Sequence, residues 1–70
     1  MNIKTGLRSG YPGGSYLDSC EIIGYNPNSR ILQANCERFD GMPNHSSMVV
    51  PEEYEDIVNC DGILAIDYCL

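Results

Sequence analysis

The stretch that decides the fold is residues 20–36, which read CEIIGYNPNSRILQANC. Residues 26–29 in its middle form a turn cluster, because proline fixes φ and asparagine tolerates left-handed backbone geometry. The residues before the turn are β-prone, and after it Leu32, Ala34 and Cys36 alternate with polar residues. The polar positions of this second strand are Gln33, Asn35 and Glu37. The stretch therefore predicts a β-hairpin with one apolar face and one polar face.

Two cysteines support this hairpin. Folding the strands about Asn28 sets Cys20 opposite Cys36 on the apolar face, with Gly24 opposite Leu32 nearer the turn. Directly opposed residues of antiparallel strands lie about 4.5–5.5 Å apart, which is within the range of a disulfide. Closing this loop would stabilise the fold by roughly 3 kcal/mol through chain entropy. We therefore predict a Cys20–Cys36 disulfide, with a pair of reduced core thiols as the alternative.

The second half of the chain continues with short elements. Residues 40–44 are typical of a turn followed by a break, and residues 47–50 of a short strand. Residues 51–57 predict one or two helical turns, since proline and acidic residues suit the first turn of a helix. Residues 59–62 contain the Asp-Gly signal of a hairpin turn, and residues 63–68 form the last strand. The predicted fold class is therefore all-β, with short antiparallel hairpins and one or two helical turns, stapled by disulfides.

A second cysteine pair leaves more than one outcome open. Cys60 and Cys69 lie at the start and the end of the last predicted strand. A fully extended strand would hold them far apart, so a mutual disulfide requires the chain to bend back after Ile66. We favour this pairing, because an unpaired thiol beside a turn is a liability. Free thiols and a bridge between two chains are the alternatives.

Size and charge exclude several functions. Seventy residues and 7.8 kDa allow one domain, which is small enough to need disulfides or oligomerisation for stability. Four basic and ten acidic residues give a net charge of −6 and an acidic pI of about 4.3. This balance argues against nucleic acid as a partner and against a polybasic membrane-binding surface. No apolar run reaches the roughly 20 residues of a membrane span, so no membrane insertion is expected.

The chain divides into a tail and one domain. Residues 1–14 contain four glycines, a proline, two of the four basic residues and no acidic residue, which is typical of a flexible N-terminal tail. A docking arm is the alternative. No apolar segment long enough for a signal peptide is visible, yet disulfides favour an oxidising setting, so we expect a secreted or extracellular protein. Residues 15–70 form the expected single domain.

No catalytic motif is visible, and we expect no enzyme activity, metal or cofactor. The single histidine, His45, lies in a predicted loop among Asn and Ser residues. A zinc site built from His45 and three cysteines is conceivable by count. However, the candidate ligands Cys20, Cys36, His45 and Cys60 are 16, 9 and 15 residues apart in sequence order and lack the close cysteine pairs of structural zinc sites.

Short polar side chains gather at the predicted turns. Carboxylates and amides on rigid turns can form paired hydrogen bonds with vicinal hydroxyl groups, which is how sugars are held. The alternative is that Asn, Asp and Ser simply populate turns. The residues are Ser15, Asp18, Ser19, Glu37, Asp40, Asn59 and Asp61.

These motifs together resemble the cyanovirin-N homology (CVNH) family, in its microvirin-like form. The resemblance rests on the order and spacing of Ser19-Cys20, residues 28–36 (NSRILQANC), Asp40-Gly41, Ser46-Ser47 and residues 59–64 (NCDGIL), and it covers residues 15–68. A family repeat carries "L-x-A-x-C" on its second strand and closes with "N-x-D-G-x-L". The chain matches a single such repeat.

The resemblance implies an all-β lectin that binds mannose-rich oligosaccharides or glycoproteins without metal and without catalysis. The implied carbohydrate-binding residues are Ser15, Asp18, Ser19, Glu37, Phe39, Asn59, Cys60 and Asp61. The alternative function is a small acidic interaction or inhibitor protein whose surface binds a basic protein partner.

A single repeat also bears on assembly. Family members pair two repeats that exchange strands, so one repeat leaves apolar faces that a second copy can cover. We predict a homodimer by strand exchange, in which Glu37 and Phe39 of one chain meet Asn59 and Asp61 of the other. The shared core would contain Leu32, Ala34, Leu64 and Ile66. The competing possibility is a self-sufficient monomer.

Overall fold

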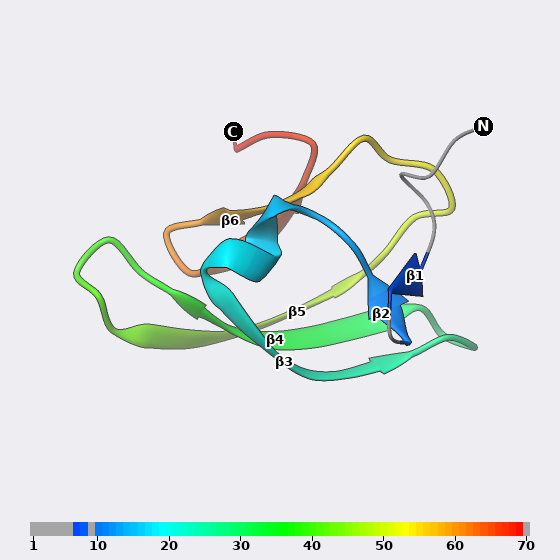
Figure 1. The fold of residues 1–70 in the computed structure, drawn as a ribbon, viewed down its shortest axis with the longest axis horizontal. Coiled ribbons are helices and arrows are strands. Elements are labelled where there is room, and N and C mark those ends of the chain that lie inside the picture. Colours follow the sequence, from blue (N-terminus) through cyan, green and yellow to red (C-terminus); the bar gives the residue numbers. More distant parts are fainter. Residues whose placement is uncertain (1–6, 9, 70) are drawn as a thin grey trace.

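The computed structural model describes residues 7–8 and 10–69, and its regular structure is almost entirely antiparallel β. Three long strands form the main sheet in the order β3-β4-β5, and two short hairpins, β1-β2 and β6-β7, form separate sheets. Figure 1 shows the main sheet as one layer, with η1 and β6 on the same side of it. The predicted all-β, disulfide-stapled fold class is confirmed. The elements are β1 (Leu7–Arg8), β2 (Tyr11–Pro12), η1 (Ser15–Asp18), β3 (Cys20–Asn26), β4 (Ile31–Glu37), β5 (Pro43–Val49), β6 (Ile57–Cys60) and β7 (Ile63–Ile66).

The β3-β4 hairpin has the predicted register at its cysteine end. Cys20 pairs with Cys36, and the two form a disulfide with a Cα–Cα distance of 4.0 Å. Nearer the turn the prediction was wrong, because Gly24 pairs with Gln33 rather than with Leu32. A β-bulge at Ile23 adds one residue to β3 and shifts the register there.

The turn of this hairpin explains the bulge. The loop between the strands contains four residues, 27–30, so Asn26 pairs with Ile31. Arg30 ends the loop in the left-handed region with φ 62°, and its N–H donates to the Asn26 carbonyl at 2.6 Å. The Asn26 side chain accepts the N–H of Asn28 at 2.9 Å, as turn asparagines do. This loop is longer than the turn about Asn28 that the sequence predicted, so the pairing next to it is offset by one residue. The bulge at Ile23 removes the offset, and Cys20 therefore pairs with Cys36 as predicted.

Strand β5 begins earlier than predicted. The sequence indicated a break over residues 42–44 and a strand only over residues 47–50, whereas β5 spans Pro43–Val49. It pairs with β4 along its whole length, from Glu37↔Pro43 to Ile31↔Val49. Proline is compatible with this position because it opens a strand at the edge of the sheet.

The predicted helical turns over residues 51–57 are absent, and β6 already begins at Ile57. The backbone amides that a helix would use are held from elsewhere. The Asp67 carboxylate accepts the N–H of Glu55 at 2.6 Å and that of Asp56 at 2.9 Å. Within the described residues, the helical structure is the 3-10 turn η1, which the sequence had not indicated. A local proline and acid signal was thus overridden by a contact that is distant in sequence.

The β6-β7 hairpin forms at the predicted Asp-Gly turn. Asp61 and Gly62 both have positive φ, 53° and 89°, as a tight hairpin turn requires. The last strand ends at Ile66 rather than at residue 68, because Asp67 adopts φ 70° and turns the chain. This bend brings Cys69 back to Cys60, and the two form the second disulfide, with a Cα–Cα distance of 5.7 Å. The favoured pairing is therefore the one that the structure contains.

The core lies between the main sheet and the β6-β7 hairpin. Its buried members come from η1, β4, the residues 50–56 connection and the hairpin. The Tyr16 hydroxyl donates to the Pro12 carbonyl, and burial raises the pKa of Tyr16 well above its usual range. The buried hydrophobic residues are Tyr16, Leu32, Ala34, Cys36, Val50, Tyr54, Ile57 and Leu64.

The N-terminal boundary of the packed structure lies before the predicted one. The predicted tail ended at Gly14, but Tyr11–Pro12 pairs with Leu7–Arg8, and Pro12 is fully buried. Gly14 also lies close to β6, since a Cβ on it would be 2.9 Å from the backbone of Ile57. The rest of the predicted tail, residues 1–6 and 9, lies outside the described residues.

The contacts expected between two exchanged chains are made within one chain. Asn59 reaches the Glu37 carbonyl, and the Asp61 carboxylate accepts the Phe39 N–H, both inside the same molecule. The residues predicted for a shared core lie in this one chain, with Leu32, Ala34 and Leu64 buried and Ile66 packed against them. The homodimer stays a prediction, and sedimentation equilibrium over a concentration series tests it.

Candidate functional site

An open groove of about 450 Å³ lies at the cysteine end of the main sheet. Its floor and walls come from the end of η1, the first residues of β3, the polar face of β4, and the turn that leads into β5. Glu21 and Asn35 are paired across β3 and β4, while Glu37 and Pro43 are paired across β4 and β5. The lining residues are Asp18, Ser19, Cys20, Glu21, Asn35, Glu37, Gly41 and Pro43.

The groove is acidic. Three of its lining residues, Asp18, Glu21 and Glu37, carry carboxylates, all three are exposed, and none of the lining residues is basic. The ion pairs found among the described residues lie elsewhere, between Arg30 and Glu52 and between Arg38 and Asp40. The three carboxylates therefore remain available to a ligand that offers hydroxyl or cationic groups.

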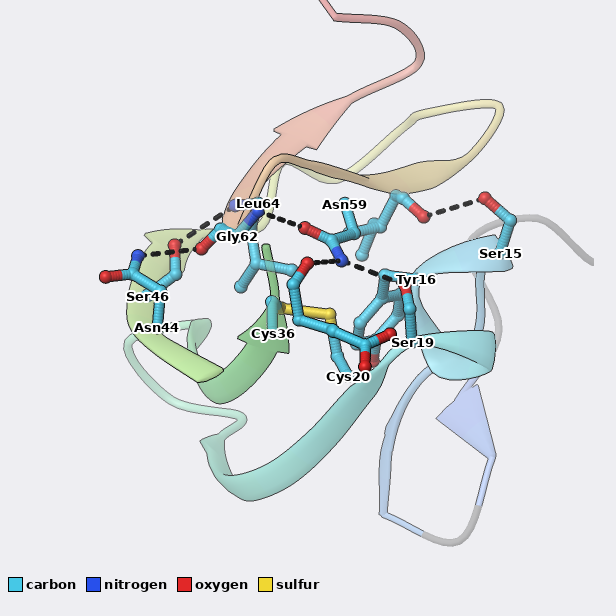
Figure 2. The surroundings of a disulfide bond; sticks show 12 residues. Ser15, Tyr16, Ser19, Cys20, Cys36, Asn44, Ser46, Asn59, Gly62 and Leu64 are labelled. Atoms are coloured by element: carbon cyan, nitrogen blue, oxygen red, sulfur yellow. Dashed lines mark hydrogen bonds between the residues drawn. A yellow bond between two sulfur atoms is a disulfide. The ribbon is translucent and has the colours of Figure 1, made fainter. Parts of the chain in front are cut away.

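Asn59 holds the two walls of the groove together. Its amide nitrogen donates to the Ser19 hydroxyl and to the Glu37 carbonyl, each at 2.9 Å. Its amide oxygen accepts the Gly62 N–H at 2.7 Å, so both ends of the carboxamide are engaged (Figure 2). A direct backbone bond from Glu37 N–H to the Ser19 carbonyl, 2.9 Å long, reinforces the same junction. Asn59 thus positions groove residues and is not free to hold a ligand.

Asp61 has a similar supporting role. Its carboxylate accepts the backbone N–H of Phe39 at 2.7 Å, which fastens the β4-β5 turn to the β6-β7 turn.

Two further side chains connect the β6-β7 hairpin to β5. Asn44 donates to the Gly62 carbonyl at 2.9 Å, and the Ser46 hydroxyl accepts the Leu64 N–H at 3.0 Å (Figure 2).

The structure brings together only some of the residues that the family resemblance implied. Asp18, Ser19 and Glu37 line the groove, and Asn59 and Asp61 support it. Phe39 projects from the bordering turn with 91% of its surface exposed.

The remaining two implied residues have structural partners instead. Ser15 does not line the groove, since its N–H and hydroxyl both donate to the Asp56 carboxylate, at 2.8 and 2.7 Å. Cys60 also lies outside the groove lining and is bonded to Cys69.

Sequence reasoning did not mark five of the lining residues for binding, namely Cys20, which it assigned only to the disulfide, and Glu21, Asn35, Gly41 and Pro43. The alternation of polar residues along the second strand was the available signal for Asn35, because it shares a face with Glu37. Glu21 could have been found from the same hairpin register, which pairs it with Asn35. Pro43 was lost because β5 was predicted to begin too late.

A second, smaller pocket of about 290 Å³ lies toward the opposite end of the main sheet. The sequence predicted the turn beside it but no pocket. The bulge at Ile23 contributes, because it places Gly24 opposite Gln33, and glycine leaves space on the sheet surface. The lining residues are Gly24, Tyr25, Asn26, Ser29, Ile31 and Gln33.

Residues 7–8 and 10–69 contain no group of three His, Cys, Asp or Glu side chains placed as metal ligands would be, and each cysteine is in a disulfide. His45 lies on the outer face of β5, with Nε2 3.3 Å from the Gln33 amide oxygen. No helix in this part has the length and hydropathy needed to cross a membrane.

Comparison with protein-family models, with curated proteins and with solved structures finds no match to this chain.

Proposed function

We propose that the chain is a carbohydrate-binding module of lectin type, which holds mannose-type glycans in the groove and performs no catalysis. The observation that carries the proposal is the groove lining, in which three exposed carboxylate residues and the half-buried Asn35 surround an open cleft. A carboxylate can accept hydrogen bonds from two neighbouring hydroxyls of one sugar ring, and an amide can donate as well as accept.

Rigidity supports the same proposal. Cys20 lines the groove and is bonded to buried Cys36, and Asn59 ties Ser19 to the end of β4. A site that is held in place before the ligand arrives loses little entropy on binding. The preference for mannose is supported by the resemblance to the CVNH family. Secretion is part of the proposal, since disulfides persist mainly in oxidising compartments.

A glycan array with matched variants tests this function. We expect mannose-dependent binding by the native chain and clearly weaker binding by Glu21→Gln and Glu37→Gln. The Glu37 substitution leaves the backbone carbonyl that Asn59 contacts. Glu53→Gln is the control, because it makes the same change in net charge at an exposed residue that does not line the groove. Equal binding by all three variants would place the sugar site elsewhere, and no glycan binding at all would reject the function.

The acidity of the groove favours one second candidate, the binding of a basic protein segment. Asp18, Glu21 and Glu37 lie there without a basic residue among the lining, on a chain of net charge −6. Such binding would weaken steeply as salt rises, because exposed charges are screened over about 10 Å at 0.1 M salt. Titration of an Arg-rich peptide at several salt concentrations separates the two functions, since neutral sugars give no such dependence.

A further inference from the structure

The groove and the second pocket open on the same face of the main sheet. Every second residue of β4 is buried in the core, so the residues between them point to the opposite side, which we call the outer face. Asn35 and Glu37 line the groove on this face. The next two outer positions toward the β3-β4 turn, Gln33 and Ile31, line the second pocket. Successive positions on one face of a strand are about 7 Å apart, so the two pockets are neighbours along β4.

The adjacent strands widen the outer face and leave it uncovered. Residues directly opposite one another in antiparallel strands share a face, so β3 and β5 add residues beside each outer position of β4. The elements η1 and β6 lie on the other side of the sheet, with the core (Figure 1). Ile31 and Val49 form a cross-strand pair and are 38% and 59% exposed, so no described part of the chain covers them. The three rows of the face are Glu21-Asn35-His45, Gly24-Gln33-Ser47 and Asn26-Ile31-Val49.

The end of the outer face near the cysteines is acidic. Asp18, Glu21 and Glu37 line the groove there, and none of the lining residues is basic. His45 borders this end from β5, with Nε2 3.3 Å from the Gln33 amide oxygen. The three carboxylates outweigh the imidazole even when it is protonated. Lysine or arginine side chains of a partner are therefore attracted to this end.

The end near the β3-β4 turn is uncharged and partly apolar. The second pocket has no Asp, Glu, Lys or Arg in its lining, and its wall includes Ile31. A Cβ on Gly24 would meet nothing within 4 Å, so the pocket is open directly above the backbone. Arg30, which adjoins Ile31 in sequence, already pairs with Glu52 at 3.4 Å. A further cation gains nothing at this end, whereas an apolar side chain can be buried there.

We propose that the outer face binds an extended segment of a partner protein, with Lys or Arg side chains in the groove and an apolar side chain in the second pocket. From Glu37 to Ile31 the two sites span about 20 Å of β4, which corresponds to about seven residues of extended chain. Every second residue of such a segment points to the sheet, so its basic and apolar residues occupy alternate positions. A second copy of this chain is a poor occupant, because both copies carry a net charge of −6.

This inference goes beyond the lectin function and rests on the second candidate, the binding of a basic protein segment. It makes that candidate more specific, because basic residues alone fill only one of the two pockets. Recognition then depends on the order of the residues in the segment and not only on their charge.

Four synthetic peptides of about seven residues, each with a terminal fluorophore, test this order by anisotropy titration with the full chain. The first has lysine at its first and third positions, leucine at its fifth and seventh, and serine between them. The second replaces both leucines by serine, and the third replaces both lysines by glutamine. The fourth has the composition of the first but places both leucines between two terminal lysines. We expect the first to bind about tenfold more tightly than each of the others, since burial of one leucine is sufficient for such a gain.

Substitutions in the chain separate the two ends of the face. Glu21→Gln should weaken binding of the first and second peptides and reduce its salt dependence, while Glu53→Gln, at an exposed residue outside both pockets, should change neither. Gly24→Val places a side chain in the second pocket and should abolish the gain from leucine, with binding of the second peptide unchanged. Ile31→Thr keeps the branched shape but removes an apolar wall, and should reduce the same gain. Circular dichroism confirms that each variant is folded.

Each other outcome has a definite meaning. Equal binding of the first and second peptides, or of the first and fourth, overturns the extended site and leaves the second candidate function standing. Native binding of the first peptide by Gly24→Val and Ile31→Thr also overturns it. Peptide binding that disappears as the chain dimerises in sedimentation equilibrium shows that a second copy occupies the face, and overturns it as well. Absence of binding by all four peptides rejects the extended site and the second candidate together, while the glycan array decides the lectin function independently.

Discussion

The side-chain amide of Asn59 donates to the backbone carbonyl of Glu37 over 2.9 Å, which ties β6 to the end of β4 across 22 positions of sequence. The same nitrogen reaches the Ser19 hydroxyl, so one carboxamide joins η1, the main sheet and the β6-β7 hairpin. Because Ser19 and Glu37 line the groove, its shape depends on how the hairpin sits on the sheet.

Replacing Asn59 by alanine should therefore loosen both the fold and the groove. The half-buried amide makes three hydrogen bonds, and we expect the free energy of unfolding to fall by about 1–3 kcal/mol, because partly buried partners are left unpaired. Urea denaturation followed by circular dichroism measures the change. Asn28→Ala is the control, because the Asn28 side chain is exposed in a turn. This substitution should lower the free energy of unfolding by less than about 0.5 kcal/mol. Equal losses for both would show that the Asn59 contacts do not hold the hairpin.

The glycine of the β6-β7 turn should tolerate no side chain. A Cβ on Gly62 would lie 2.7 Å from Cγ of Arg38 and 2.9 Å from Cβ of Asn44, and the residue also has φ +89°. Gly41→Ala is a matched control, because Gly41 has φ +86° and nothing within 4 Å of the added atom. We expect Gly41→Ala to cost about 1–2 kcal/mol through backbone strain alone. Gly62→Ala should cost about 1–3 kcal/mol more through the clash, as measured by thermal unfolding. Similar losses would mean that the neighbours of Gly62 move aside freely.

The two disulfides should differ in what they protect. Cys36 is fully buried in the core, whereas Cys69 is exposed at the end of the chain. The double variant Cys60→Ser/Cys69→Ser should fold and lose roughly 2.5–3 kcal/mol, the chain-entropy value for so short a loop. The double variant Cys20→Ala/Cys36→Ala should lose more, because it also removes packed sulfur atoms from the core. Guanidinium unfolding ranks the two, and a larger loss for the Cys60–Cys69 pair would contradict this assignment. Alkylation without reduction should modify no cysteine of the native chain.

Stability should fall as the solution becomes alkaline. Burial raises the pKa of Tyr16, and that of Tyr54 is raised chiefly by burial, with smaller contributions from Tyr25 and Asp56. In the unfolded chain both phenols ionise near the ordinary pKa of 10.0, whereas in the folded chain they ionise only at higher pH. The contribution of these two tyrosines to the free energy of unfolding is therefore fully present below about pH 10 and decreases above it.

A spectrophotometric titration of tyrosine ionisation checks this expectation. Some of the five tyrosines should ionise only together with the loss of the native circular dichroism. In the Tyr16→Phe variant, the free energy of unfolding should depend less on pH in alkaline solution, although the substitution also leaves the Pro12 carbonyl without its hydrogen-bond donor. Ionisation of all five tyrosines in the folded protein would reject the burial argument.

The local patterns of the sequence determined the hairpins and their cysteine register. These patterns act through interactions between residues that are near neighbours in sequence. They are the turn at residues 26–29, the alternation after it and the Asp-Gly pair at residues 61–62, and the structure contains both turns. The Cys20–Cys36 disulfide followed from the same register. The length of the turn did not follow from the local patterns. The structure has a four-residue loop, and a bulge at Ile23 compensates for it, so that the same two cysteines are still paired.

Contacts between distant segments were decided only by the tertiary structure. Asp67 holds residues 55–56 out of the helix that their composition favours, and the hairpin closes on the sheet of its own chain. The resemblance named Asn59 and Asp61 as sugar ligands, yet the fold uses both to fasten turns and leaves Glu21 and Asn35 to line the groove. The physical reason is that a polar side chain at a turn can bind either a ligand or another segment of the same chain. Which of the two it binds depends on where that other segment lies, and this information is not local in the sequence.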